Sequence, residues 1–327
     1  MTNPCHQRAI SVSLGCHAGP STSPVMANDL HEPAAAAADQ HTGDWCAAHP
    51  CKGLQLGLGA LLITVGAAAD ISGLSRELMQ AVHGGHALWH DAWAALTLLG
   101  FGWPLLILAA VFAGARGTPA SVLLKAALLA MVFAQLPKAL LQRPRPALVL
   151  DPSELSIVGD AVLHTASMPS GHALAAFALV AAAWCGCRDH LGGPWSWRQR
   201  LGWGSAWGLA SAVAWSRVAV GAHWPSDVLV GAGLGLWVGV LAWRWEMRWP
   251  WGAWFESPSG RWAVPAFLTV SALAWGLTRT GYPSAAWLQA ALVALALIEA
   301  CRQFWQRSQM TASVQGPAAS LQRRSQR

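Results

Sequence analysis

Long apolar runs separated by short polar loops constrain this chain more than any other feature. Eight such runs follow one another between residues 54 and 298. Charged residues make up only 11% of the 327 residues, whereas an average soluble domain has about 25%. A helix needs about 20 mostly apolar residues to cross the hydrocarbon of a bilayer. The sequence therefore predicts an all-α, multi-pass membrane protein.

The predicted spans form a six-span bundle followed by two additional C-terminal spans. They lie at residues 54–69 (with 71–74 as an extension), 92–115, 120–141, 170–187, 201–216, 226–243, 263–277 and 285–298. Pro104 is expected to kink the second span, because proline removes a helical hydrogen bond. In the sixth span, glycines four residues apart predict a ridge that lets a neighbouring helix approach closely; they are Gly231, Gly235 and Gly239.

This pattern also predicts the division of the chain. Residues 1–52 are rich in Ala, Ser, Pro, His and Gly and lack periodicity, so they are expected to form a disordered leader. Residues 53–245 form the six-span domain, and residues 246–301 hold the two additional spans. Residues 302–327 are expected to be a basic, disordered tail.

Three polar clusters lie at the ends of these runs and all fall on one side of the membrane. Charged groups at such positions indicate a functional site by default, because they are costly unless paired or hydrated. Together the clusters supply three cations, two imidazoles and one carboxylate, which suits a bound oxyanion. They are Lys138 and Arg145; Pro169, Ser170, Gly171 and His172; and Ser216, Arg217, His223 and Asp227.

The local chemistry of the clusters supports an anion site. Ser170 is suited to cap the helix that starts after it, and free N–H groups at a helix N-terminus bind phosphate. Gly171 allows close approach of the backbone. Asp227, four residues after His223, can fix the tautomer of that imidazole, as the acid of a catalytic triad does. Each cluster alone also has an ordinary structural explanation, namely interfacial anchors, a helix cap or a structural histidine. Their joint placement favours function.

In the residues of these three clusters, the sequence resembles the type 2 phosphatidic acid phosphatase superfamily, which includes bacterial acid phosphatases and vanadium haloperoxidases. The resemblance rests on the pattern K-x6-R-P, P-S-G-H and S-R-x5-H-x3-D, whose spacings all match here. It implies that His223 is the nucleophile, Asp227 its partner and His172 the acid that protonates the leaving oxygen. It also implies phosphate-binding residues: Lys138, Arg145, Ser170, Gly171 and Arg217.

The predicted function is hydrolysis of a terminal phosphate from a lipid phosphate or diphosphate, through a phosphohistidine. Expected substrates are phospholipid or isoprenyl phosphates. The resemblance implies no metal and no other cofactor, and nucleic acid is not expected as a partner. The alternatives are a lipid phosphotransferase with the same site, a non-enzymatic transporter of an anion or lipid, and vanadate-dependent halide oxidation. The sequence leaves the oligomeric state and the lipid open.

The distribution of Lys and Arg predicts the orientation. Most basic residues outside the clusters lie on the opposite side of the bundle, among them Arg116, Arg188, Arg198 and Arg244. Only Arg76, Arg143 and Arg279 lie on the cluster side outside the proposed site. By the positive-inside rule the termini are cytoplasmic, and the site faces the periplasm or the cell exterior. The expected location is the inner (cell) membrane.

Overall fold

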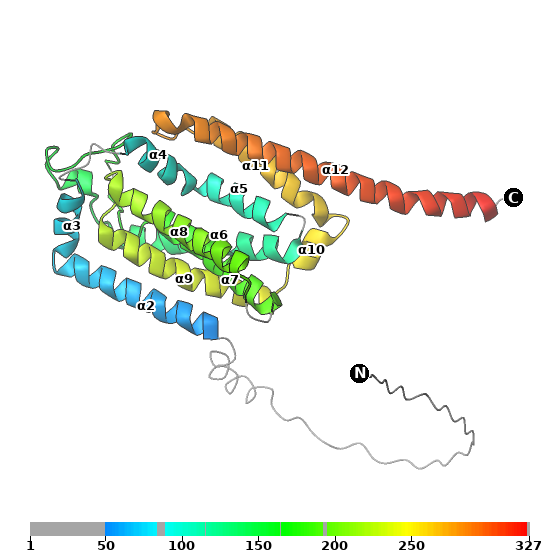
Figure 1. Cartoon of the computed structure of the whole chain (residues 1–327), viewed down its shortest axis with the longest axis horizontal. Helices are drawn as coiled ribbons and strands as arrows, with labels where there is room; N and C mark the ends of the chain where they lie inside the picture. The colour runs from blue at the N-terminus through cyan, green and yellow to red at the C-terminus, as the bar shows by residue number, and fades with distance from the viewer. Residues whose placement is uncertain (1–49, 84–88, 115, 164, 192–194, 326–327) are drawn as a thin grey trace, which may run out of the picture. The chain divides into compact units, whose positions relative to one another are not determined.

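The structure is a computed structural model that describes residues 50–83, 89–114, 116–163, 165–191 and 195–325. Most of the leader expected at residues 1–52 lies outside this part, but residues 50–52 already belong to the first described helix. The described chain contains helices and loops and no strand, which confirms the all-α class (Figure 1).

The long helices follow the predicted spans in order. They are α2 (Pro50–Ile71), α4 (His90–Leu99) with α5 (Gly102–Ala113), α6 (Gly117–Leu141), α7 (Gly171–Leu191), α8 (Trp197–Ala219), α9 (Pro225–Arg248), α11 (Ala263–Leu277) and α12 (Ala286–Ser325). The short elements between them are α3 (Leu74–His83), α10 (Gly252–Glu256) and the 3-10 turns η1 (Pro146–Leu148), η2 (Gly260–Trp262) and η3 (Pro283–Ala285).

Several of these helices are long and apolar enough to cross a bilayer. In the described residues four meet this criterion alone, in α2, α6, α9 and the α12 region, and the α4–α5 pair makes a fifth if it is one broken span. The apolar part of α7 is shorter (Gly171–Cys187), and α8 and α11 do not meet the criterion. The chain is therefore a multi-pass membrane protein, while the count of eight spans stays a prediction.

The second predicted span is broken at a different residue from the one expected. Helices α4 and α5 meet at an angle of 63°. The break falls at Gly100 and Phe101, whereas Pro104 lies in the first turn of α5, where its missing N–H leaves no bond unmade. A Cβ at Gly100 would lie 2.6 Å from Cδ2 of His172, so the break leaves room for that ring.

Helix α9 lies at the centre of the bundle and packs against α2, α6, α7 and α8. The predicted glycine ridge faces α7. A Cβ at Gly231 would lie 2.6 Å from the carbonyl oxygen of Ser170, and one at Gly235 would lie 2.5 Å from that of Leu174. Real Cβ atoms do not come this close, so the ridge allows a contact between the two backbones that no larger residue permits.

A buried ion pair joins the ends of α6 and α9 on the side opposite the polar clusters. Lys125 is fully buried and Glu246 is 3% exposed. The Lys125 ammonium donates to Glu246 and to the carbonyl oxygen of Trp249, at 2.6 Å for the latter. It also lies 4.4 Å from the ring centroid of Trp251. Ser121 donates to the same carboxylate, so the charge is fully hydrogen-bonded.

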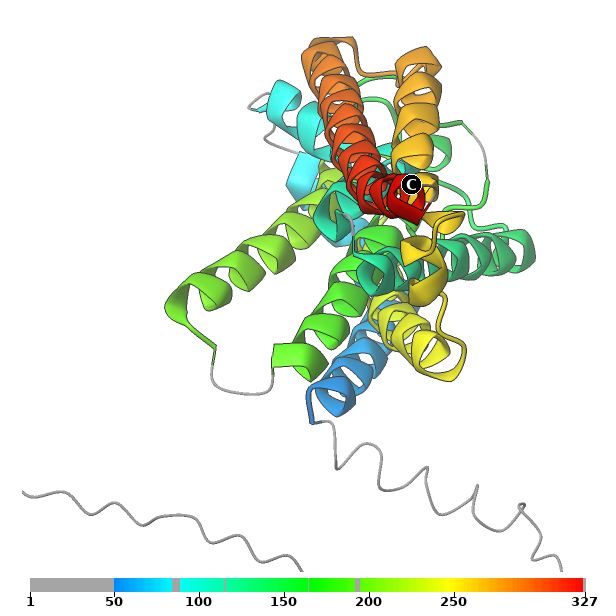
Figure 2. The ribbon, with the colours of Figure 1, turned by 90° about the vertical axis from the view of Figure 1, so that its right-hand side faces the viewer.

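The additional C-terminal helices pack on the rest of the bundle. Helices α11 and α12 lie side by side, and they contact α4 and α5 (Figures 1 and 2). The described residues belong to a single compact unit. The basic tail from Arg302 is helical as far as Ser325, where the sequence predicted disorder. The α11–α12 pair is called the C-terminal hairpin below.

Candidate active site

The three polar clusters meet at one end of the bundle. Lys138 lies in the last turn of α6, and Arg217 lies in the last turn of α8. His172 lies in the first turn of α7, and Asp227 in the first turn of α9. Because these helices alternate in direction, two C-terminal ends and two N-terminal ends face the same point.

Two prolines bring two arginines to this point. Helix α6 ends before the sequence Arg143-Pro144-Arg145-Pro146, in which two prolines disfavour the helical conformation of the residues that precede them. Arg145 is extended, with φ −78° and ψ 160°. Side chains two residues apart in an extended segment point to the same side. Accordingly, Arg143 reaches Asp227 at 2.5 Å and Arg145 reaches His223 Nε2 at 3.1 Å.

The turn between α8 and α9 holds His223 and orients its ring. Gly221 has a φ of +79°, which a residue with a side chain rarely adopts, and it makes the turn tight. The N–H of His223 donates to the carbonyl oxygen of Arg217 at 3.1 Å. The ring Nδ1 lies 3.3 Å from Oδ2 of Asp227, and Nε2 lies beside Arg145. Nδ1 thus faces a carboxylate, while Nε2 faces a cation.

The surroundings of His223 keep its ring neutral. Its side chain is 3% exposed. Burial first, and then the positive charges of Arg145, Arg217 and Lys138, hold the pKa of His223 well below its ordinary value. A neutral imidazole carries the lone pair that a nucleophile needs.

Asp227 also caps its own helix. Its Oδ2 accepts from the backbone N–H of Trp224 at 3.0 Å, as an acidic residue in the first helical turn commonly does. Ser167 donates to the same oxygen. Asp227 is fully buried, so its two oxygens are fixed from several directions. The capping role and the orienting role are combined in one carboxylate.

The segment from Ser170 to His172 supplies polar atoms without partners. The backbone N–H of Ser170 donates to the carbonyl oxygen of Asp227 at 2.9 Å, which ties the second cluster to the third. Within the described residues, Ser170 Oγ and His172 Nε2 are buried and have no hydrogen-bond partner. Buried polar atoms without partners are rare, and they fit a site that receives a ligand.

The remaining predicted residues complete the arrangement. A Cβ on Gly171 would lie 3.6 Å from Lys138 Nζ, so the bare backbone of Gly171 faces that ammonium. The charges of Lys138, Arg145 and Arg217 all act on the ring of His172. The Nε atoms of Arg145 and Arg217 are buried without a partner in the described part of the chain. The structure therefore brings all eight predicted site residues together; they are Lys138, Arg145, Ser170, Gly171, His172, Arg217, His223 and Asp227.

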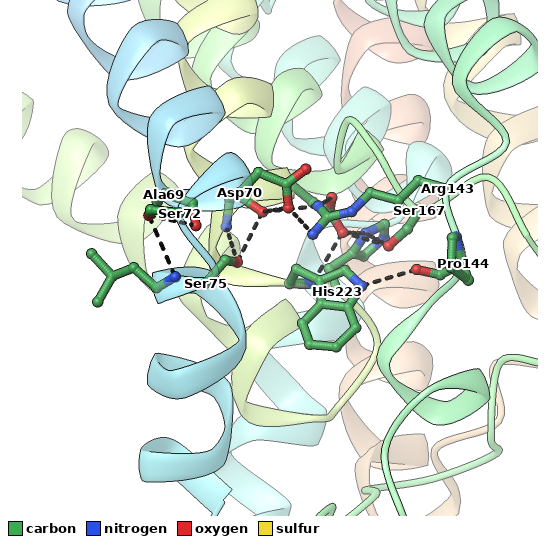
Figure 3. A network of polar contacts seen from close by, with 12 residues as sticks. Ala69, Asp70, Ser72, Ser75, Arg143, Pro144, Ser167 and His223 are labelled. Carbon is green, nitrogen blue, oxygen red and sulfur yellow. Dashed lines mark hydrogen bonds and ion pairs between the residues drawn. The ribbon is translucent and has the colours of Figure 1, made fainter.

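Arg143 was expected to lie outside the site, and this expectation is wrong. Its guanidinium bridges Asp227 and Asp70, the last acidic residue of α2, and it donates to Ser226 at 2.8 Å. Figure 3 shows Asp70, Arg143, Ser167 and His223 in one polar network between α2 and the α8–α9 turn. The alternation Arg-Pro-Arg-Pro is the signal in the sequence that indicates a shared direction for the two arginines.

Thr97, Ser167 and Tyr282 are further members of the network. Arg217 donates to Thr97 Oγ1 and, at 3.3 Å, to the hydroxyl of Tyr282. Thr97 and Tyr282 come from segments distant from the three clusters, and Ser167 lies two residues before Pro169, outside the P-S-G-H motif, so the motifs mark none of the three.

The donors of the site are mostly cations and imidazoles, which suit an anion. In the described residues no group of three or more His, Cys, Asp or Glu side chains is arranged to hold a metal ion. The carboxylate of Asp227 is already engaged by Arg143, Ser167 and Trp224.

The fold is that of a helical membrane protein, and three cations, two imidazoles and one carboxylate converge at one end of the bundle. Comparison with known families agrees with the predicted resemblance: residues 119–251 match the model of the PAP2 superfamily. The matched stretch includes all three motifs. A search of curated proteins found no match.

Two solved structures are similar to this chain. LpxE from Aquifex aeolicus has 26% identity and a TM-score of 0.43, and the alignment covers 52% of this chain and 95% of that one. The first transmembrane PAP2 type phosphatidylglycerolphosphate phosphatase from Bacillus subtilis has 21% identity and a TM-score of 0.48, with 60% and 96% covered.

Proposed function

We propose that the chain is a membrane lipid phosphatase that removes a terminal phosphate through a phosphohistidine at His223. The observation that carries this proposal is the setting of one imidazole: Nδ1 of His223 lies 3.3 Å from Asp227, its Nε2 lies 3.1 Å from Arg145, and the charges of Arg217 and Lys138 also act on the ring. An imidazole that is held neutral and oriented beside an anion site suits attack on phosphorus.

In the proposed first step, the Nε2 lone pair of His223 forms a bond to phosphorus as the bond from phosphorus to the lipid oxygen breaks. Nδ1–H donates to Asp227, which stabilises the positive charge that develops on the ring. The negative charge of the bound phosphate offsets the nearby cations and keeps His172 protonated, and His172 transfers this proton to the leaving oxygen. Its buried Nε2 is available for this because it has no hydrogen-bond partner within the described residues.

In the second step a water molecule attacks phosphorus, and the bond to His223 breaks. His172, now neutral, takes a proton from that water, and inorganic phosphate leaves. Lys138, Arg145 and Arg217 bind the phosphate oxygens in both steps, with help from Ser170 and the backbone of Gly171. Fixed cations that are already in place stabilise charge in a transition state without further reorganisation.

We propose a lipid as substrate because the site lies at the end of a bundle that spans a bilayer. We also propose that this end faces the outside. Arg116, Arg198 and Arg244 lie at the other ends of their helices, which agrees with the positive-inside rule. A reporter fused after Arg327 should be active in the cytoplasm, and activity only outside the cytoplasm would reverse this orientation.

Phosphate release tests the proposal. The full chain in detergent is given phosphatidic acid labelled in the phosphate, in the presence of EDTA. Wild type should release phosphate, and His223→Ala should release none while its thermal unfolding is unchanged. The exposed residue His90 at the start of α4 offers a matched control, because His90→Ala should keep wild-type turnover.

Rapid quenching in alkali should trap label on His223, since phosphohistidine survives in base. With a substrate that has a good leaving group, His172→Ala should still form the labelled enzyme but should hydrolyse it slowly. Phosphate release by His223→Ala at the wild-type rate would refute the mechanism.

A further inference from the structure

Tyr282 is the only tyrosine of the chain, and it comes from the C-terminal hairpin, outside the residues that match the PAP2 superfamily. It lies in the loop between α11 and η3 and is 5% exposed. Its ring belongs to the same apolar cluster as Val220 and Ala222 of the α8–α9 turn. The loop of the hairpin thus shares an apolar cluster with the turn that carries His223.

The backbone of this loop is built to approach the site end of the bundle. Gly281 has a φ of +75°, and its carbonyl oxygen accepts from the N–H of Asp160 at 3.1 Å. A Cβ at Gly159 would lie 2.7 Å from the ring of Tyr282, so only a glycine allows this approach. The position of Tyr282 therefore follows from two glycines in facing loops.

The hydroxyl of Tyr282 lies among the groups proposed to hold phosphate. Arg217 Nη1 donates to it at 3.3 Å, and Tyr282 interacts electrostatically with Arg145. Phe101 connects the tyrosine to the proposed acid, since its ring centroid lies 6.4 Å from that of Tyr282 and 4.9 Å from that of His172. Two residues of the proposed machinery, Arg217 and Arg145, thus interact with this side chain, and His172 is linked to it through Phe101.

The bond to Arg217 uses the phenol oxygen as an acceptor and leaves the O–H proton to donate. Within the described residues no acceptor for that proton is found. A phosphate oxygen held by Arg217 and Arg145 would be an acceptor in the appropriate place. Since such a bond goes to a charged acceptor, it is stronger than one between neutral groups.

We propose that Tyr282 donates its hydroxyl proton in a hydrogen bond to the bound phosphate, so that the C-terminal hairpin completes the phosphate site. This inference rests on the proposed function of the same site. It gives the hairpin a role in binding the substrate phosphate, in addition to its role in packing.

Two measurements on the full chain test this role. Tyr282→Phe removes only the hydroxyl; it should weaken inhibition by orthovanadate, a phosphate analogue, and lower kcat/KM, each by about tenfold to a hundredfold. The control is Trp287→Phe, an exposed position (65%) at the start of α12, which should match wild type in both. Because the chain has one tyrosine, 3-fluorotyrosine gives a single fluorine resonance, which should shift when vanadate is added to the wild-type sequence.

The outcomes separate this inference from the proposed function. If wild type releases no phosphate but the resonance shifts and Tyr282→Phe weakens vanadate binding, the phosphatase proposal fails and the tyrosine remains in an anion site. Unchanged vanadate inhibition in Tyr282→Phe overturns the inference even if the resonance moves. A resonance that does not respond to vanadate overturns it too, because any loss in the variant is then structural.

Discussion

Arg143 offers the sharpest test of how the site is supported. It contacts the carboxylate of Asp227 and is not among the residues proposed to bind phosphate. Its guanidinium donates to Asp227 and Ser226 and pairs with Asp70 of α2. We expect Arg143→Ala to leave the phosphate-binding cations in place and to free one oxygen of Asp227. The carboxylate then holds the ring of His223 less firmly.

The size of the effect follows from the contacts. A hydrogen bond to a charged group contributes about 1.5–3 kcal/mol, and a tenfold change in rate corresponds to about 1.4 kcal/mol. Loss of the bond to the fully buried Asp227 should therefore lower kcat/KM about 10- to 150-fold. Asp70 is 31% exposed, so its own pairing with Arg143 is screened by solvent. Asp70→Asn should cost only about twofold to fivefold, because exposed pairs contribute about 1 kcal/mol or less.

A double-mutant cycle measures whether Asp70 acts through Arg143. Phosphate release from labelled phosphatidic acid is measured for wild type, Arg143→Ala, Asp70→Asn and the double variant, with thermal unfolding as the check on folding. Asp70→Asn should have little effect once Arg143 is absent. An equal loss of kcat/KM from Asp70→Asn with and without Arg143 would show that the contacts from Asp70 through Arg143 and Asp227 do not support His223. Wild-type kcat/KM in Arg143→Ala would show the same.

Two further predictions concern pH and stability. Burial and the charges of Arg145, Arg217 and Lys138 hold the pKa of His223 well below its ordinary value, so its neutral form persists as the pH falls through about 6.5. The bell-shaped pH profile of kcat/KM, corrected for the ionisation of the substrate, should therefore have its acidic limb below that pH. An acidic limb at or above about pH 6.5 would contradict the assignment of His223 as the nucleophile. At the other end of the bundle, Lys125→Met leaves Glu246 buried and unpaired and should destabilise the fold by about 3–5 kcal/mol, while adding Glu246→Leu should restore most of the loss. Thermal unfolding measures this, with phosphate release per folded molecule unchanged; a double variant no more stable than Lys125→Met would argue against the pairing.

The sequence was sufficient to predict the site wherever short-range rules apply. Ser170 and Asp227 are recognisable from the helices that begin beside them, and the spacing from His223 to Asp227 places the two side chains within reach. The glycines of α9 predict a close helix contact, which the structure confirms against α7. These inferences need only the periodicity of one helix.

Long-range contacts could not be predicted in the same way. Asp70 is 73 positions before Arg143 in the chain, and Tyr282 is 65 residues from Arg217. Nothing local distinguishes Tyr282 from an interfacial aromatic residue. The kink predicted at Pro104 is absent for a related reason. A proline breaks a helix only in its interior, and Pro104 lies in the first turn of α5. The actual break, at Gly100, is accompanied by a contact with His172, which is distant in the sequence.

The glycine ridge of α9 affects the distance between the two histidines of the proposed active site. His172 lies on α7 and His223 precedes α9, so in the proposed mechanism the distance between the two imidazoles depends on the distance between these two helices. The close packing of α7 against α9 continues to Gly239, where a Cβ would lie 2.7 Å from the backbone nitrogen of Ala182. A methyl group added at Gly239 would push α7 and α9 apart, and we expect this displacement to change the distance between His172 and His223. We therefore expect the distance between His172 and His223 to depend on a position in the interior of α9, far from the residues proposed to bind phosphate.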